Sequence, residues 1–217
     1  MPAKTNFVLI SIVAFGAFIV FSFIVRQGFL NGFDFDTTVR LQNHFPRAFD
    51  VPFSVFSLLG SLEVTGLIWA GFVIYFFLRK QTRTIFALCL LFFGLFIEIA
   101  GKFFLYHPSP PFRFYRGLGI VFPSNYLHTD YSYPSGHVFR TSFMVFFMIA
   151  FLYNRKFVNR GLYAFLLILF LLVMAVSRIY LGEHWFSDVV GGVFLGTWTG
   201  LAAGITINRR GKGTNSV

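Results

Sequence analysis

His184 and Asp188 form the pattern in this sequence that is most suited to chemistry. They are four residues apart, so both side chains lie on one face of a helix if the last helix begins near His184. A carboxylate bound to one ring nitrogen of a histidine raises the basicity of the other nitrogen, so His184 is a candidate nucleophile or base. Arg178, just ahead of the pair, is a forked cation suited to phosphate oxygens. The pair alone would fit a helix cap, but three ionisable groups beside apolar runs favour a functional site.

A second pattern, Pro-Ser-Gly-His at residues 134–137, directly precedes an apolar run. Ser135 is suited to cap the start of a helix. Gly136 would let an anion approach the free N–H groups of that helix start. His137 lies beside these groups, where it could give a proton to a leaving oxygen. Taken alone, this motif fits an ordinary helix cap equally well.

A third pattern places Lys102 four residues after Glu98. A helix-end lysine with a glutamate one turn earlier is a common and weakly stabilising pair, and the alternative is a cation directed at phosphate. The three patterns together supply cations, anion-binding donors and two histidines. This set suits phosphoryl transfer through a histidine nucleophile, a reaction that needs no metal and no other cofactor.

The composition indicates an integral membrane protein. The chain has 217 residues, of which 56% are apolar and 12% charged, and 34 are Phe. A soluble domain is about 25% charged and could not cover so much apolar surface. We expect an all-α bundle of six transmembrane helices forming one domain over residues 1–217, because runs of this length cross a bilayer. The first run exceeds the core of a signal peptide, so we expect it to remain as a span. The expected spans are 7–25, 63–78, 84–104, 138–153, 161–177 and 189–208.

The net charge of +10 is concentrated at one end of these spans. With six crossings, both termini and two connecting loops share a side that carries only basic residues. The positive-inside rule makes that side cytoplasmic, so the protein is predicted to be multi-pass in the plasma (inner) membrane with the three motifs extracytoplasmic. We interpret the clusters as topological anchors that contact anionic lipids, not as a nucleic-acid site. Their members are Lys4, Arg79, Lys80, Arg83, Arg155, Lys156, Arg160, Arg209, Arg210 and Lys212.

The order of the motifs resembles the type 2 phosphatidic acid phosphatase family, membrane lipid phosphatases related to vanadium haloperoxidases. The family pattern is Lys-x6-Arg-Pro, then Pro-Ser-Gly-His, then Ser-Arg-x5-His-x3-Asp, and the second and third parts match in full. The first part departs from it, because Ser109 stands where the family has arginine. Arg113, Arg116 and Arg140 are candidates to replace that cation.

The resemblance implies a mechanism and a role for each site residue. His184 would attack phosphorus and form a phosphohistidine, Asp188 would hold and polarise His184, and His137 would protonate the leaving lipid oxygen. The groups that would bind the phosphoryl oxygens are Lys102, Ser135, the N–H of Gly136, and Arg178.

Several alternatives stay open at this point. The family's substrates include phosphatidic acid, phosphatidylglycerol phosphate, undecaprenyl diphosphate and lipid A phosphates, and the sequence does not choose among them. The same site could pass the phosphoryl group to another acceptor, or could bind or transport lipid phosphates with weak catalysis. Glycines spaced by four indicate close helix packing, inside the bundle or at a homodimer interface. They are Gly192, Gly196, Gly200 and Gly204.

Overall fold

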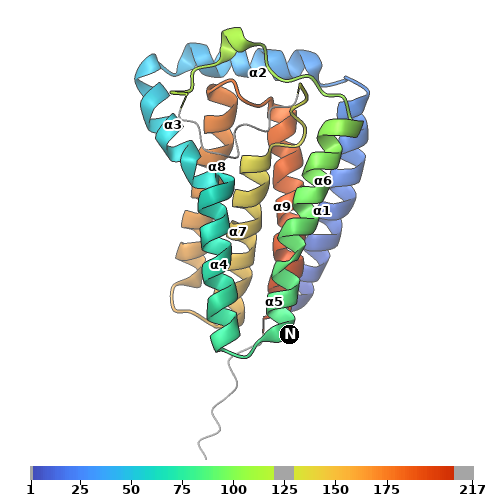
Figure 1. Cartoon of the computed structure of the whole chain (residues 1–217), viewed down its shortest axis with the longest axis vertical. Coiled ribbons are helices and arrows are strands. Elements are labelled where there is room, and N and C mark those ends of the chain that lie inside the picture. Colours follow the sequence, from blue (N-terminus) through green and yellow to red (C-terminus); the bar gives the residue numbers. More distant parts are fainter. Residues whose placement is uncertain (1, 120–129, 208–217) are drawn as a thin grey trace, which may run out of the picture.

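The computed structural model describes residues 2–119 and 130–207, and this part of the chain is a helical bundle (Figure 1). Within these ranges the structure contains no strand, and an isolated antiparallel bridge joins Pro108 to Tyr131. The long helices run side by side, and α2 lies across one end of the bundle (Figure 1). The helices are α1 Pro2–Arg26, α2 Asn31–His44, α3 Asp50–Ser57, α4 Leu62–Leu78, α5 Thr82–Leu88, α6 Leu90–Phe104, α7 Gly136–Asn154, α8 Arg160–Tyr180 and α9 Phe186–Ile205. Short 3-10 turns are η1 Arg47–Phe49, η2 Leu58–Gly60 and η3 Phe112–Phe114.

Five described helical segments are long and apolar enough to cross a membrane. A sixth candidate is the pair Arg47–Gly60 and Leu62–Leu78, which is bent by 41° at its break. The prediction of an all-helical membrane bundle is therefore confirmed. The five segments are Lys4–Arg26, Thr82–Phe104, Gly136–Asn154, Arg160–Tyr180 and Phe186–Ile205.

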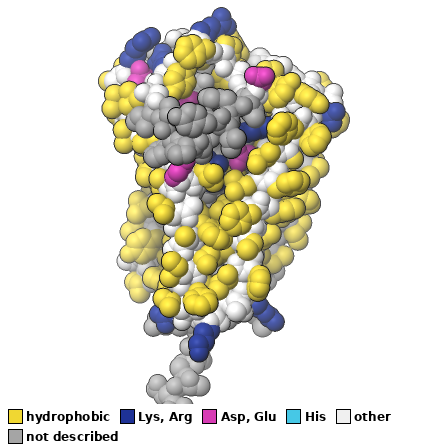
Figure 2. Space-filling model, viewed as in Figure 1, with side chains coloured by type: hydrophobic (Ala, Val, Ile, Leu, Met, Phe, Trp, Pro, Cys, Tyr) yellow, Lys and Arg dark blue, Asp and Glu magenta, His cyan; other side chains and the backbone are white. Residues whose placement is uncertain are grey.

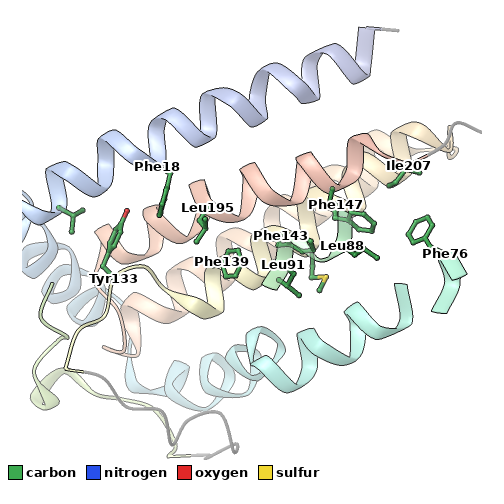
Figure 3. Close-up of a cluster of buried hydrophobic side chains, with 13 residues drawn as sticks. Phe18, Phe76, Leu88, Leu91, Tyr133, Phe139, Phe143, Phe147, Leu195 and Ile207 are labelled. Atoms are coloured by element: carbon green, nitrogen blue, oxygen red, sulfur yellow. The ribbon is translucent and has the colours of Figure 1, made fainter. Parts of the chain in front are cut away.

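On the face seen in Figure 2, the surface along the helices is mostly apolar, and most charged side chains lie toward the two ends of the bundle. Such a surface suits a hydrocarbon environment between two polar layers. Inside, aromatic side chains of α7 form much of the core (Figure 3). Phe139, Phe143 and Phe147 are fully buried, and Leu195 of α9 and Leu91 of α6 pack in the same cluster. α7 is thus the central helix on which its neighbours pack.

The glycines of α9 allow its backbone to touch that of α7. A Cβ atom at Gly196 would lie 2.5 Å from the carbonyl oxygen of Phe139, and one at Gly200 would lie 2.5 Å from that of Phe143. At Gly192 the nearest atom would be the carbonyl oxygen of Ser135, at 2.7 Å. No side chain fits at these distances. The glycine repeat therefore packs inside the bundle, where it fixes the start of α9 against the start of α7.

We expect Gly196→Ala to destabilise the protein, because its methyl group would overlap the α7 backbone. Overpacking of this kind costs about 1–3 kcal/mol, which outweighs the roughly 0.5–1 kcal/mol that alanine gains over glycine in a helix. The matched control is Gly66→Ala on α4, where a Cβ would meet nothing within 4 Å. Thermal unfolding in detergent should show a lower Tm for Gly196→Ala and an equal or higher Tm for Gly66→Ala. Equal Tm values for the two variants would contradict the packing account.

Candidate active site

The three sequence motifs meet at the end of the bundle where α2 lies. Arg178, Lys102 and His184 are close enough to His137 to interact with it electrostatically. Five elements contribute these groups, so the cluster exists only in the folded bundle. Lys102 is in the last turn of α6, His137 is in the first turn of α7, Arg178 is in the last turn of α8, His184 lies in the turn between α8 and α9, and Asp188 is in the first turn of α9.

His184 and Asp188 contact one another, but not as neighbours on one helix face. A shared helix face required a helix that begins near His184, and this condition is not met, because α9 begins at Phe186 and His184 precedes it in the chain. The Nδ1 atom of His184 is 3.4 Å from Oδ2 of Asp188, and the same oxygen accepts a 2.8 Å hydrogen bond from the N–H of Trp185. Asp188 therefore both caps the start of α9 and orients the imidazole, which leaves Nε2 of His184 without a hydrogen bond to any described residue.

His184 is held neutral by its surroundings. Burial lowers the pKa of His184 below the ordinary 6.5, and the positive charges of Arg178 and Lys102 lower it further, against the opposing effect of Asp188. A neutral imidazole has a free electron pair on the nitrogen that does not face the carboxylate. At neutral pH this nitrogen is ready to act as a nucleophile.

Ser135 is at the N-cap position of α7, yet the expected cap hydrogen bond does not form. Its N–H donates to the carbonyl oxygen of Asp188 at 2.9 Å, which ties the start of α7 directly to α9. Its Oγ is buried without a hydrogen-bond partner among the described residues, and so is Nε of Arg178. Buried polar atoms are normally paired, so two unpaired ones at the same cluster suit a ligand with oxygen acceptors.

The absence of a side chain at Gly136 leaves room for the carboxylate of Glu98 as well as opening the start of α7. A Cβ atom at this position would lie 2.2 Å from Oε1 of Glu98 and 2.9 Å from Nη1 of Arg140. Glu98 accepts from Lys102 at 3.0 Å and from Arg140 at 3.5 Å. Arg140 also donates to the carbonyl oxygen of Gly60 at 3.2 Å. Glu98 therefore joins two of the site's cations, whereas the sequence had indicated only its pairing with Lys102.

Arg178 also has a carboxylate partner. Its Nη2 forms an ion pair with Glu183, and its Nη1 donates to the hydroxyl of Ser57 in α3. The guanidinium is buried, with only 4% of the side chain exposed. Buried charges are costly unless they are paired, so these contacts hold the guanidinium in place. The roles of Glu183 and Ser57 were not predicted from the sequence.

His107 and Asp34 extend the cluster, and sequence reasoning missed them as site residues. Nδ1 of His107 is 3.0 Å from Oδ1 of Asp188, and its Nε2 is 3.6 Å from Oδ2 of Asp34. Burial lowers the pKa of His107, but the hydrogen bonds and charges of Asp188 and Asp34 outweigh burial and raise it to about 9. His107 is therefore a cation at neutral pH. A motif search could not find this contact, because 81 residues separate His107 from Asp188.

Comparison with known proteins identifies the family. The sequence model of the PAP2 superfamily matches residues 82–212, which include all three motifs. The chain belongs to the PAP2 superfamily. Its structure is similar to the crystal structure of a transmembrane PAP2-type phosphatidylglycerolphosphate phosphatase from Bacillus subtilis, with a TM-score of 0.69 and 19% sequence identity. The alignment covers 89% of this chain and 93% of that chain. No curated protein matches the sequence.

The first PAP2 motif is incomplete in this chain, and the three candidate replacements lie in different places. Arg113 stacks on the rings of Phe35 and Phe114, at 5.9 and 5.1 Å. Arg116 donates to the hydroxyl of Tyr180 at 3.2 Å. The contacts of these two arginines are thus with aromatic side chains. Arg140 alone of the three is near His137. Ser109 itself donates its N–H to the carbonyl oxygen of Asp130 at 3.0 Å.

We expect this PAP2 protein to lose stability as the pH rises through about 9. The pKa of His107 is higher in the folded protein than its ordinary 6.5, so its stabilising contribution is complete below pH 6.5 and is lost as the pH passes about 9. The Tm in detergent should fall between pH 7 and 10 in the wild type. In His107→Gln, which does not titrate, the fall should be smaller. Parallel curves for the two proteins would contradict the assignment of this charge.

Proposed function

We propose that this protein is a membrane phosphatase that hydrolyses a lipid phosphate or diphosphate through a phosphohistidine at His184. The observation that carries the proposal is the neutral His184, held through Nδ1 by the fully buried Asp188 and surrounded by cations. A cluster of cations around a nucleophile can stabilise the charge that develops on a transferring phosphoryl group. Membership of the PAP2 superfamily supports the same reaction class.

In the first step, Nε2 of His184 attacks phosphorus, and the bond from phosphorus to the leaving oxygen breaks. His137, which takes up a proton together with the anionic substrate, gives this proton to that oxygen, so the lipid leaves as an alcohol, or as a monophosphate from a diphosphate substrate. Lys102 and Arg178 neutralise the phosphoryl oxygens. The unpaired hydroxyl of Ser135 and the N–H of Gly136 add donors at the start of α7.

In the second step, water attacks the phosphorus of the phosphohistidine, and the phosphorus–nitrogen bond breaks. His137, now neutral, accepts the proton of the water. Inorganic phosphate leaves, and both histidines return to their starting protonation states. The net reaction consumes one water and releases one phosphate and one dephosphorylated product.

We further propose that the site faces the extracytoplasmic side of the plasma membrane. At the opposite end of the bundle, Lys80 lies in the turn after α4 and Arg83 in the first turn of α5, and Arg155 and Lys156 lie in the turn between α7 and α8. Lys4 lies at that end as well, where its Nζ donates to the carbonyl oxygen of Ile205. Basic groups at this end support a cytoplasmic location for it and for both termini. The basic residues at 209, 210 and 212 lie outside the described residues.

The lipid substrate would reach this site from the outer leaflet, between helices. The Bacillus subtilis protein of similar fold is described as a phosphatidylglycerolphosphate phosphatase. Phosphatidylglycerol phosphate is therefore the first substrate to test here, beside phosphatidic acid and undecaprenyl diphosphate.

We expect His184→Ala to lower phosphate release by about 10³-fold or more, because the proposed mechanism then lacks its nucleophile. His137→Ala should lower it by about 10²- to 10⁴-fold, the usual contribution of a general acid. The matched control is His44→Ala, since His44 is an exposed histidine at the end of α2. The assay is release of inorganic phosphate from the three lipids by purified protein in detergent.

Wild-type rates in folded His184→Ala would overturn the proposal. A requirement for an added alcohol before the wild type turns over would instead identify a phosphotransferase. Binding of the lipids without turnover in any condition would identify a binding or transport protein.

A further inference from the structure

We propose that His107 and Asp34 are positioning residues that hold Asp188 in the orientation that His184 needs. The inference rests on the proposed function, because it concerns the same site. It adds two residues that lie outside the three motifs, one on the loop after α6 and one on α2. It also gives α2, which lies across the end of the bundle, a direct connection to the catalytic pair (Figure 1).

The two oxygens of Asp188 have different partners. Oδ2 accepts from the N–H of Trp185 at 2.8 Å and faces the ring of His184 at 3.4 Å, so the backbone of this turn holds one oxygen only. Oδ1 is bound by Nδ1 of His107 at 3.0 Å. Because the two oxygens belong to one planar group, a bond that holds Oδ1 also sets where Oδ2 points. His107 therefore helps to determine the direction in which Asp188 meets His184.

Asp34 lies on the other side of the His107 ring from Asp188. Nε2 of His107 lies 3.6 Å from Oδ2 of Asp34. Asp34 is in turn bound to α9, since its oxygens accept from the N–H of Ser187 at 2.8 Å and from the hydroxyl of Ser187 at 2.7 Å. Ser187 directly precedes Asp188. The contacts thus link α2, the loop after α6 and the start of α9: His107 has a carboxylate on each side, and one of these, Asp34, is bound to the residue next to Asp188.

The loop that carries His107 is fixed by its backbone. The carbonyl oxygen of His107 accepts from the N–H of Ser132 at 3.0 Å, and that of Pro108 accepts from the indole of Trp185 at 2.7 Å. Trp185 also donates its own N–H to Asp188. The loop is therefore attached to the same turn that holds His184 and Asp188, and His107 has a defined place beside them.

The ring of His107 carries a positive charge between the two carboxylates. Each ring nitrogen of His107 faces a carboxylate, so the ring is doubly protonated, in accord with its pKa of about 9. The charged groups that face it are Asp188 from α9 and Asp34 from α2. The ring of Tyr133 packs edge-on against it, with centroids 6.4 Å apart, and burial raises the pKa of Tyr133 so that this phenol stays neutral. Loss of the His107 proton would leave two buried carboxylates with one neutral ring between them.

The test compares three variants of the purified full-length protein by kcat, KM and their pH dependence on the lipid that the wild type turns over. Asp34→Asn keeps an oxygen for Ser187 but removes the negative charge that stabilises the His107 cation. His107→Gln keeps a donor for Asp188 but does not titrate. The matched control is Asp36→Asn, an exposed aspartate on the same helix α2.

We expect Asp34→Asn and His107→Gln to lower kcat by about 10- to 100-fold, because each variant removes a group that orients Asp188, the partner of the nucleophile. KM should stay within about twofold of the wild type. In Asp34→Asn, the pH above which kcat falls should move to a lower value, because His107 loses its proton more easily. In His107→Gln, this fall should be absent or weaker. Asp36→Asn should match the wild type in all three measurements.

A wild-type kcat and pH profile in Asp34→Asn would overturn the inference. So would a parallel loss in kcat and Tm with an unchanged pH profile, which would mean that the pair serves stability only. If His107→Gln does not yield folded protein, Asp34→Asn decides the question alone. Failure of the proposed function gives a different result, because then the wild type itself, or the His184→Ala variant, breaks the expected pattern.

Discussion

The buried negative charge of Asp188 is the constraint that the rest of this site satisfies. The side chain is fully buried at the end of an otherwise apolar bundle. A carboxylate in such a place is stable only when donors surround it closely. His107, His184 and the N–H of Trp185 provide them, and the start of α9 adds the positive end of its dipole. The orientation of His184, the proposed nucleophile, thus results from how this charge is accommodated.

The cations of the site are accommodated in a similar way. Glu98 balances Lys102 and Arg140, and Glu183 balances Arg178. Each acidic partner lets a cation remain near the two histidines before any phosphate arrives. A phosphate ester that enters the cluster would compete with these carboxylates for the same guanidinium and ammonium groups. In the proposed function the phosphate would thus replace these carboxylates as the partner of the cations, which are paired before it arrives.

The membrane bundle and the three motifs could be predicted from the sequence because both depend on local signals. Long apolar runs determine helices in lipid, and the sequence spacing from His184 to Asp188 corresponds to a contact even though His184 lies before the helix. Sequence reasoning did not predict the contact of His107 with Asp34, or the contacts of Arg178 with Glu183 and Ser57. The first contact arises only when the loop after α6 meets α2 and α9. No periodicity or local spacing predicts such a tertiary contact, and the sequence around a single histidine among prolines does not indicate which residue it will contact.

Ser135 illustrates a different limit of the sequence. Its position at the start of α7 was predictable, but its hydroxyl does not cap the helix. The reason is tertiary, since its N–H is bound to the carbonyl oxygen of Asp188 and the α9 backbone lies against it through Gly192. The hydroxyl is left unpaired among the cations, where the proposed mechanism uses it.

The most direct test of the account is to find which residue carries the phosphoryl group during turnover. The wild-type protein would be mixed with a ³²P-labelled lipid phosphate, quenched rapidly in base, digested and mapped by mass spectrometry. The account predicts an acid-labile, base-stable label on the peptide that contains His184. A label on another residue, or none at any time during steady turnover, would contradict it.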